Sequence, residues 1–204
     1  MPDIKLISDV RAYTLYSTRN ADKKFANFKS KVLLRDNNTC SFCTFKAQKH
    51  MVVINFDGNY KNNDISNLAT ACLFCAQCHF LPFVGKAPGT SGDLIHLPDM
   101  SQSDLNALCH VIFCIMHNQA KFSREAEKIY KGLKLRSKLI EDVWGKSFSN
   151  PSQFGQLLID TPLEKIKAVQ HQLLSEVRLL PSFTGFSKYI GDWSASAIEQ
   201  GILD

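Results

Sequence analysis

The sequence contains two Cys-x-x-Cys pairs, Cys40 with Cys43 and Cys72 with Cys75. Two thiolates on one tight turn can reach the same metal ion, and zinc takes four such ligands at the corners of a tetrahedron. The pairs are separated by 28 residues, more than the spacing of about 15 to 20 that is usual in zinc ribbons, so a strand and a loop must fill the gap. The sequence therefore predicts one structural Zn²⁺ ion, held by these four cysteines.

Two further candidate ligands follow the second pair. Cys78 lies three residues after Cys75 and His79 comes next, so the run CLFCAQCH offers more donors than a tetrahedral ion takes. Cys75 with Cys78 is the competing pair. We prefer Cys72 with Cys75, because the turn after SNLATA suits a metal-binding knuckle better than the helix that should already be running by Cys78. A ligand role for Cys78 or His79 stays open on sequence grounds.

The composition excludes several classes of protein. With 45% hydrophobic and 21% charged residues, the chain of 204 residues is of ordinary globular type. No apolar run reaches the ~18 residues of a membrane span, and the N-terminus lacks a signal-peptide pattern. We therefore expect a cytoplasmic protein, in which seven cysteines, an odd number, favour metal ligation over disulfides. The net charge of +5 permits nucleic-acid binding without indicating it.

The first part of the chain is typical of a small α/β module, which we place at residues 1–85. Residues 21–35 carry apolar residues at helical intervals and predict a leading amphipathic helix. Residues 51–66 predict a strand and an irregular hairpin loop, because the β-branched run MVVINF precedes the turn dipeptide Asp57-Gly58. A helix should follow Asn67.

A linker rich in Gly, Pro and Ser, residues 84–93, precedes a second region at residues 94–204. There Thr161 is a predicted N-cap with Pro162 and Glu164 after it, which together give three signals for a helix start. We expect this region to be helical throughout. Its predicted helices are 101–118, 123–144, 151–159, 161–180 and, interrupted at Gly191, 186–203.

The run from Asp57 to Cys75 resembles part of the HNH endonuclease fold, a treble clef. That fold has a cysteine knuckle, a hairpin bearing a histidine, an Asn-Leu pair and a second knuckle that opens a helix. Asn67-Leu68 and the pair Cys72 and Cys75 match its second half. The expected fold class is therefore α+β, with a small treble-clef, HNH-like zinc module packed on a larger, mostly α-helical region.

The first half of the HNH motif is degenerate. Where these nucleases place the histidine that acts as general base, this chain has Asn55, and an amide cannot accept a proton near neutral pH. His50, Asp57 and His79 lie nearby in the sequence, but none falls at the motif position. We therefore expect no catalytic residue and no enzymatic activity, with a metal-dependent nuclease kept as the alternative.

Across nearly its whole length the chain resembles the IcmJ/DotN family. The motifs that carry this resemblance are RDNNTCSFC, NLATACLFCAQCHF, LNALCHVIFC, FGQLLID and RLLPS. The family is a zinc-containing component of the Dot/Icm type IVB secretion system. The resemblance implies a non-catalytic adaptor in the type IV coupling complex, which binds the C-terminal extension of the coupling ATPase DotL and contacts other subunits. It also implies a cytoplasmic location, peripheral at the inner membrane, and a role in effector export.

A second set of possible ligands lies on one predicted helix. His110, Cys114 and His117 share a face at i, i+4 and i+7. Only three donors are present, so we interpret this face as a partly buried packing surface rather than a second metal site. A nucleic-acid-binding zinc module without catalysis remains a further alternative to the adaptor.

Overall fold

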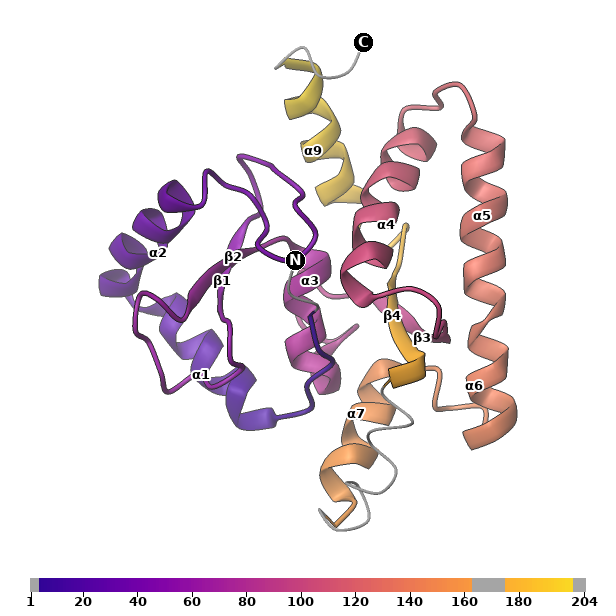
Figure 1. Ribbon diagram of the computed structural model, residues 1–204, viewed down its shortest axis with the longest axis horizontal. Helices are drawn as coiled ribbons and strands as arrows, with labels where there is room; N and C mark the ends of the chain where they lie inside the picture. The colour runs from indigo at the N-terminus through magenta and orange to yellow at the C-terminus, as the bar shows by residue number, and fades with distance from the viewer. Residues whose placement is uncertain (1–3, 163–174, 200–204) are drawn as a thin grey trace.

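The computed structural model describes residues 4–162 and 175–199. The chain is a mixture of helices and two small antiparallel sheets, which agrees with the predicted α+β class. Figure 1 shows the N-terminal helices and hairpin on the left and the later helices on the right. The N-terminal elements are α1 (Val10–Ala21), α2 (Lys23–Arg35), β1 (Val52–Asn55), β2 (Leu68–Ala71), α3 (Leu73–Ala76) and the 3-10 helix η1 (Gln77–Phe83).

Two capped helices open the chain. The carboxylate of Asp9 accepts from the backbone N–H groups of Arg11 and Ala12 and so caps α1. Asp22 ends α1 and caps α2 by accepting from Lys24 N. The predicted helix at 21–35 is confirmed as α2, whereas α1 was not predicted from the sequence.

The predicted strand is confirmed as β1 and the predicted loop follows it, but the return strand β2 lies directly after Asn67, where a helix was expected. β1 pairs with β2 in antiparallel register, with Asn55 opposite Leu68. The loop is held by Asn67, whose Nδ2 donates to Asp57 Oδ1 at 2.9 Å and to Asn62 O at 2.8 Å. The expected helix begins only after β2, as the short α3, and Cys72 is its N-cap residue.

The region after residue 94 is not helical throughout, and this expectation was wrong. β3 (Gly92–His96) pairs with β4 (Val177–Pro181), so the predicted linker ends in a strand and the predicted helix 161–180 ends in another. Gly92 permits the pairing, because a Cβ there would lie 2.4 Å from Leu180 O. Residues 163–174 lie outside the described residues, so the earlier part of that predicted helix stays a prediction.

The remaining helices follow the predicted order with two corrections. The segment predicted as one helix at 123–144 is broken at Arg136, whose Nε donates to His96 O while its own carbonyl accepts from His96 N. Gly191 does not interrupt the last helix. The helices are α4 (Gln102–His117), α5 (Ser123–Leu135), α6 (Ser137–Trp144), α7 (Pro151–Asp160) and α9 (Ser187–Glu199).

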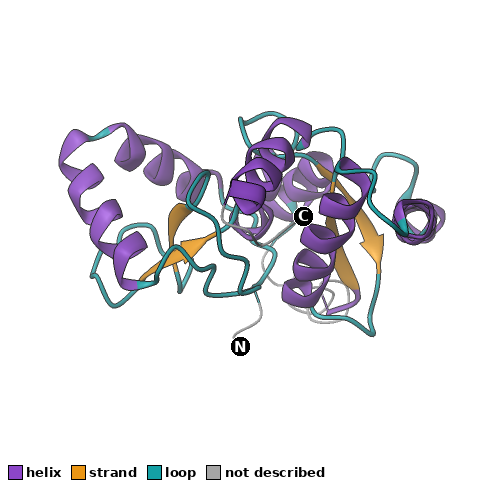
Figure 2. Cartoon of the chain, turned by 90° about the horizontal axis from the view of Figure 1, so that it is seen from above, coloured by secondary structure: helices purple, strands orange, loops and turns teal. Residues whose placement is uncertain are grey.

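One hydrophobic core runs through both parts of the chain. It contains Phe42, Phe74 and Leu81 from the N-terminal elements together with Phe113 and Leu179 from the later ones. Figure 2, viewed from above, shows the two small sheets set apart with helices between them. The division into 1–85 and 94–204 therefore stays a prediction. Within the part of the chain that the structure describes, we find no helix long and apolar enough to cross a membrane.

Candidate metal centre

The first cysteine pair lies on a tight turn. Cys40 N donates to Phe45 O at 2.8 Å, and Thr44 N donates back to Cys40 O at 3.0 Å. Thr44 adopts a positive φ of 61°, which closes the turn at the cost of a conformation that non-glycine residues seldom take. Ser41 N donates to Thr70 O at 2.9 Å and so fixes the turn to β2. Both thiols therefore face the end of the hairpin.

The second pair lies where β2 becomes α3. Cys72 is extended and caps the helix, with its Sγ accepting from Cys75 N at 3.4 Å. One helical turn then brings the Cys75 thiol beside that of Cys72. Because β1 and β2 pair over their whole length, the hairpin holds this turn next to the first one.

The structure brings the four predicted cysteines together. The Sγ atoms of Cys40, Cys43, Cys72 and Cys75 all lie within 4.8 Å of one another, and the Cys43–Cys72 distance is 3.6 Å. Four thiolates at ~2.3 Å from a tetrahedral zinc ion would lie about 3.8 Å apart. All four residues are at most 3% exposed. The cluster could therefore hold a metal ion with no room for a further ligand from solvent.

The electrostatics of the cluster also favour a cation. Burial is the largest influence on Cys72 and Cys75, and it raises the pKa of both thiols well above the usual value. Hydrogen bonds from the thiols of Cys43, Cys72 and Cys75 lower the pKa of Cys40. Protein groups alone therefore favour the thiolate of Cys40 and disfavour those of Cys72 and Cys75, and a bound cation would be needed to deprotonate these two.

Two side chains of α4 form hydrogen bonds with the cluster. Asn106 Nδ2 lies 3.2 Å from Cys75 Sγ, and His110 Nε2 lies 3.3 Å from Cys72 Sγ. Burial lowers the pKa of His110 to about 3, so its ring is neutral at neutral pH and can donate one N–H. Such outer donors orient thiolate ligands and partly neutralise their charge.

The outer donors connect the cluster to the second sheet. Gln102 Nε2 donates to Asn106 Oδ1 at 3.0 Å and to Leu179 O at 2.9 Å, while Gln102 Oε1 accepts from Leu179 N at 2.7 Å. A continuous set of hydrogen bonds thus runs from β4 through α4 to Cys75. Sequence reasoning missed Asn106 and Gln102. The one available signal was that residues 102, 106 and 110 recur every four positions on a single helix face.

The competing ligands lie elsewhere. The Cys78 thiol donates to Phe74 O at 3.4 Å, one turn back along the chain. His79 Nδ1 lies 3.1 Å from the hydroxyl of Tyr60, and the ring is 2% exposed. Among the described residues, the group of His, Cys, Asp or Glu side chains that could hold a metal contains neither of them.

Asn55 stands where the related nucleases place their general base, and its side chain is held by hydrogen bonds to neighbouring residues. Its Oδ1 accepts from Arg19 Nη1, and its Nδ2 donates to Asn59 O at 3.0 Å and to Asn62 O at 2.5 Å. Arg19 also donates to Val53 O at 3.0 Å. The side chain is fully buried and holds the hairpin loop closed.

The other residues near the nuclease motif are also engaged elsewhere. His50 Nε2 lies 2.7 Å from Asp192 Oδ2 on α9. Asp57 accepts from Asn59 N at 2.8 Å and from Asn67 Nδ2. Burial is the largest single influence on Asp57 and acts to raise its pKa, but the hydrogen bonds from this loop together hold the pKa below the usual value. The His50 contact joins its loop to α9, and the Asp57 contacts hold the hairpin loop closed.

Comparison with known proteins identifies the family of this chain. No protein-family model matches it. A curated protein of Legionella pneumophila subsp. pneumophila (strain Philadelphia 1), the Type 4 apparatus protein DotN, is 42% identical over 198 residues, which cover 97% of this chain and 92% of that protein. The chain belongs to the DotN family. The resemblance that the sequence motifs carried is thereby confirmed.

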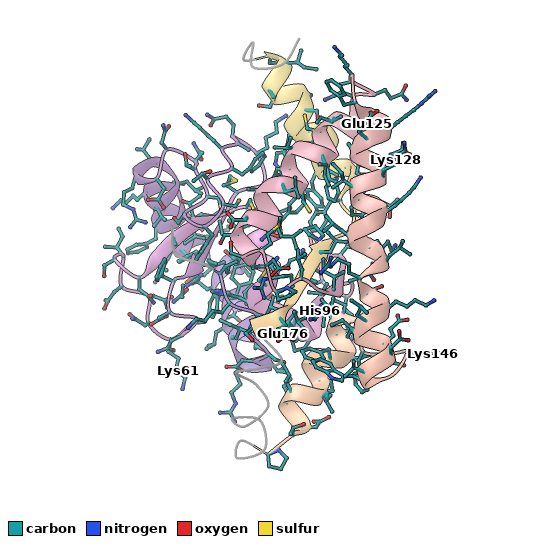
Figure 3. All side chains as sticks on the ribbon, turned by 45° about the vertical axis from the view of Figure 1, so that its right-hand side comes forward. Lys61, His96, Glu125, Lys128, Lys146 and Glu176 are labelled. Carbon is teal, nitrogen blue, oxygen red and sulfur yellow. The ribbon has the colours of Figure 1, made fainter. Side chains whose placement is uncertain are left out.

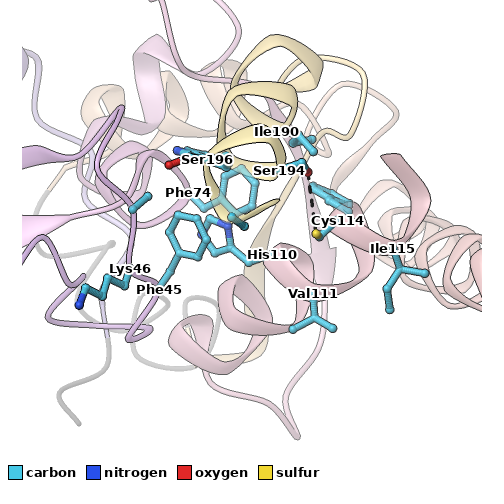
Figure 4. A pocket seen from close by; sticks show the side chains of 14 residues that line it. Phe45, Lys46, Phe74, His110, Val111, Cys114, Ile115, Ile190, Ser194 and Ser196 are labelled. Atoms are coloured by element: carbon cyan, nitrogen blue, oxygen red, sulfur yellow. Dashed lines mark hydrogen bonds between the residues drawn. The ribbon is translucent and has the colours of Figure 1, made fainter. Parts of the chain in front are cut away.

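Beside the cysteine cluster, this DotN-family chain has an apolar cavity of about 340 Å³ between α4, α9 and the first cysteine turn. Figure 4 shows Phe45 and His110 next to each other at its wall, and their rings stack 3.6 Å apart. The thiol of Cys114 lies 3.8 Å from Ser194 Oγ on α9, and His117 lies against Gly191. The face with His110, Cys114 and His117 therefore packs on α9, as interpreted from the sequence.

Proposed function

We propose that this protein is a non-catalytic structural subunit of the type IV coupling complex of a Dot/Icm type IVB secretion system. In this proposal it binds the cytoplasmic C-terminal tail of the coupling ATPase DotL, contacts other subunits of the complex, and works in the cytoplasm at the inner membrane for effector export. The observation that carries the proposal is the 42% identity, over 97% of the chain, to a type 4 apparatus protein.

The metal in this proposal is a structural Zn²⁺ ion bound by Cys40, Cys43, Cys72 and Cys75. A fully sulfur-coordinated, buried site suits zinc and leaves no position for a reactive water. The order of knuckle, hairpin, knuckle and helix supports a treble-clef, HNH-like module.

The test of the zinc assignment is elemental analysis and thermal melting of the wild type beside Cys72→Ser, with Cys114→Ser as the control. One zinc per chain in the wild type, lost with a lower Tm only in Cys72→Ser, is expected. Equal zinc in all three proteins would refute the assignment.

The adaptor role is tested by titration calorimetry of the purified zinc-loaded protein with the DotL tail. We expect specific binding with a negative heat-capacity change, since a segment that orders on binding buries apolar surface. Salt should weaken this complex only modestly. Absence of binding to the tail would refute the adaptor.

A nucleic-acid module is the second candidate, and one observation favours it. The whole net charge of +5 falls in residues 1–85, because residues 86–204 carry equal numbers of acidic and basic side chains. Binding to phosphates would release counterions, so the affinity would fall steeply with salt. Tight, salt-sensitive binding to a random DNA duplex, with none to the tail, would support this candidate over the adaptor.

A further inference from the structure

α5 and α6 form an almost continuous helical segment with apolar side chains on two faces. The inner face packs on α4 and β3, and its spacing alternates between four and three residues as in a heptad pattern. One such face is enough to hold a helix on a core. The buried and half-buried residues of this face are Ala126, Tyr130, Leu133, Ser137, Ile140 and Trp144.

A second apolar stripe lies on the outer side of the same segment. Leu135, Leu139 and Val143 follow one another at intervals of four residues, which places them in one row. Their exposed fractions are 72%, 48% and 73%. The row continues toward the N-terminus through Gly132 to Ile129. A Cβ added at Gly132 would meet nothing within 4 Å, and Ile129 is 48% exposed. We call these five residues the outer ridge.

Two lysines flank the outer ridge, one at its N-terminal end and one near its middle. Lys128 and Lys138 are exposed and form no salt bridge with any residue that the structure describes. Lys128 lies two helical turns before Leu135, and Lys138 lies less than one turn after it. Figure 3 shows Lys128 projecting outward from α5, Lys146 on the same side just after α6, and Lys61 on the opposite side of the molecule.

The charges at the two ends of the ridge distinguish between possible partners. Glu125 and Asp142, both exposed, lie near Ile129 and Val143 respectively. An anionic membrane would approach these carboxylates at both ends and be repelled. A second copy of the chain packed in parallel would place lysines near lysines. A protein helix with acidic residues opposite Lys128 and Lys138 meets neither difficulty.

We propose that the outer ridge is a docking surface for an acidic amphipathic helix. The row of side chains four residues apart fits into the groove of such a helix, and Gly132 lets the partner backbone approach closely. The inference rests on the proposed function, because we assign that helix to the tail of the coupling ATPase. It adds the surface and the chemistry that the proposed function leaves open.

The experiment measures tail binding to full-length, zinc-loaded variants by titration calorimetry. Leu135→Asp combined with Val143→Asp places charges in the ridge, and both side chains are already solvent-exposed, so folding should be unaffected. Lys128→Glu combined with Lys138→Glu reverses the local charge. Leu34→Asp and Lys61→Glu are the matched controls, because Leu34 is 80% exposed on another helix. Circular dichroism melts check that each variant folds.

We expect the ridge double variant to raise the Kd at least tenfold. The lysine double variant should raise it several-fold and flatten its salt dependence, and the controls should match the wild type. If the wild type binds the tail and the ridge double variant binds it equally well, the docking surface is overturned and the proposed function stands. The Ala197→Trp variant fills the cavity beside α9. If only this variant loses tail binding, the tail binds at that cavity and the outer ridge is overturned as the docking surface. No tail binding by the wild type would overturn the proposed function and this inference together.

Two further measurements address the other partners. Cosedimentation of the wild type with anionic vesicles, abolished in the ridge variant while tail binding is retained, would overturn the inference in favour of a membrane. A dimer in analytical ultracentrifugation that becomes a monomer only in the ridge variant would overturn it in favour of self-association. A monomer that ignores vesicles and loses the tail in the ridge variant supports it.

Discussion

The imidazole Nε2 of His110 lies 3.3 Å from the thiol sulfur of Cys72, although the two residues are 38 positions apart along the chain. Phe45 and Phe74 stack on the two faces of this ring at 3.6 and 4.2 Å. The ring therefore has little freedom to turn away from the sulfur. A residue of the later helical region thus completes the surroundings of a site whose four cysteines all come from the N-terminal elements.

His110→Ala should weaken zinc binding without abolishing it. Loss of an outer hydrogen bond to a ligand typically lowers metal affinity by roughly 10- to 100-fold. Competition with a chromogenic chelator measures the affinity directly. His117→Ala, on the exposed end of the same helix, is the control and should leave the affinity unchanged. Equal affinity in the two variants would show that the His110 contact does not act on the metal.

His79 should make stability depend on pH. Burial lowers its pKa to about 4, whereas an unfolded histidine has a pKa near 6.5. Between these values the unfolded chain binds more protons, so the free energy of unfolding falls as the pH drops from about 6.5 to 4, by on the order of 3 kcal/mol. Denaturant titrations of the wild type and His79→Phe should diverge over this window. Loss of zinc in acid should affect both proteins equally. If the free energies of unfolding of the wild type and His79→Phe change in parallel with pH, this prediction is contradicted.

Asn55→His should not create a nuclease. The position is fully buried and is occupied by hydrogen bonds from Arg19 and to the hairpin loop, so an added imidazole has no access to a substrate. We expect plasmid DNA to stay intact with Mg²⁺, Mn²⁺ or Ni²⁺. Loss of one charge-assisted and two amide hydrogen bonds should lower stability by about 2 to 4 kcal/mol. Cleavage by this variant, but not by the wild type, would contradict the prediction.

Gly132 and Gly155 should respond oppositely to alanine. Both are helical, and a Cβ at Gly132 meets nothing within 4 Å, whereas one at Gly155 would lie 2.8 Å from Pro82 N. Gly132→Ala should therefore stabilise the free protein by roughly 0.5 to 1 kcal/mol through its helix propensity. Gly155→Ala should destabilise it, since α7 would have to move away from η1. Thermal melts of the two variants provide the measurement, and a shift of the same sign in both would be inconsistent with this packing.

Local features were predictable from the sequence, and features made by distant partners were not. The cysteine turns, α2, β1 and the loop after β1 follow from short runs whose spacing specifies them. β4 was predicted as helix because Leu179 and Leu180 suit either structure, and its partner β3 pairs with it from residues 92–96. The break between α5 and α6 likewise depends on His96, which lies far away in sequence.

The same limit applies to the metal centre. The sequence predicted its four cysteines, and the structure places them together, while their role as zinc ligands stays a prediction. Asn106 and His110 could not be assigned to the centre, because nothing local shows that α4 would pack against the cysteine turns. Their contribution appears only when the two parts of the chain are assembled around one core.

The side chain of Gln102 has a consequence for how partners can bind. By pairing with both the N–H and the carbonyl of Leu179, it takes the place of a neighbouring strand along the outer edge of β4. On the other edge, Leu94 N and His96 N donate to the carbonyls of Ser149 and Arg136. Neither edge of this sheet has room for an added strand, which removes a common route to aggregation and to peptide recognition by strand addition. A partner of this region has to be recognised through side chains.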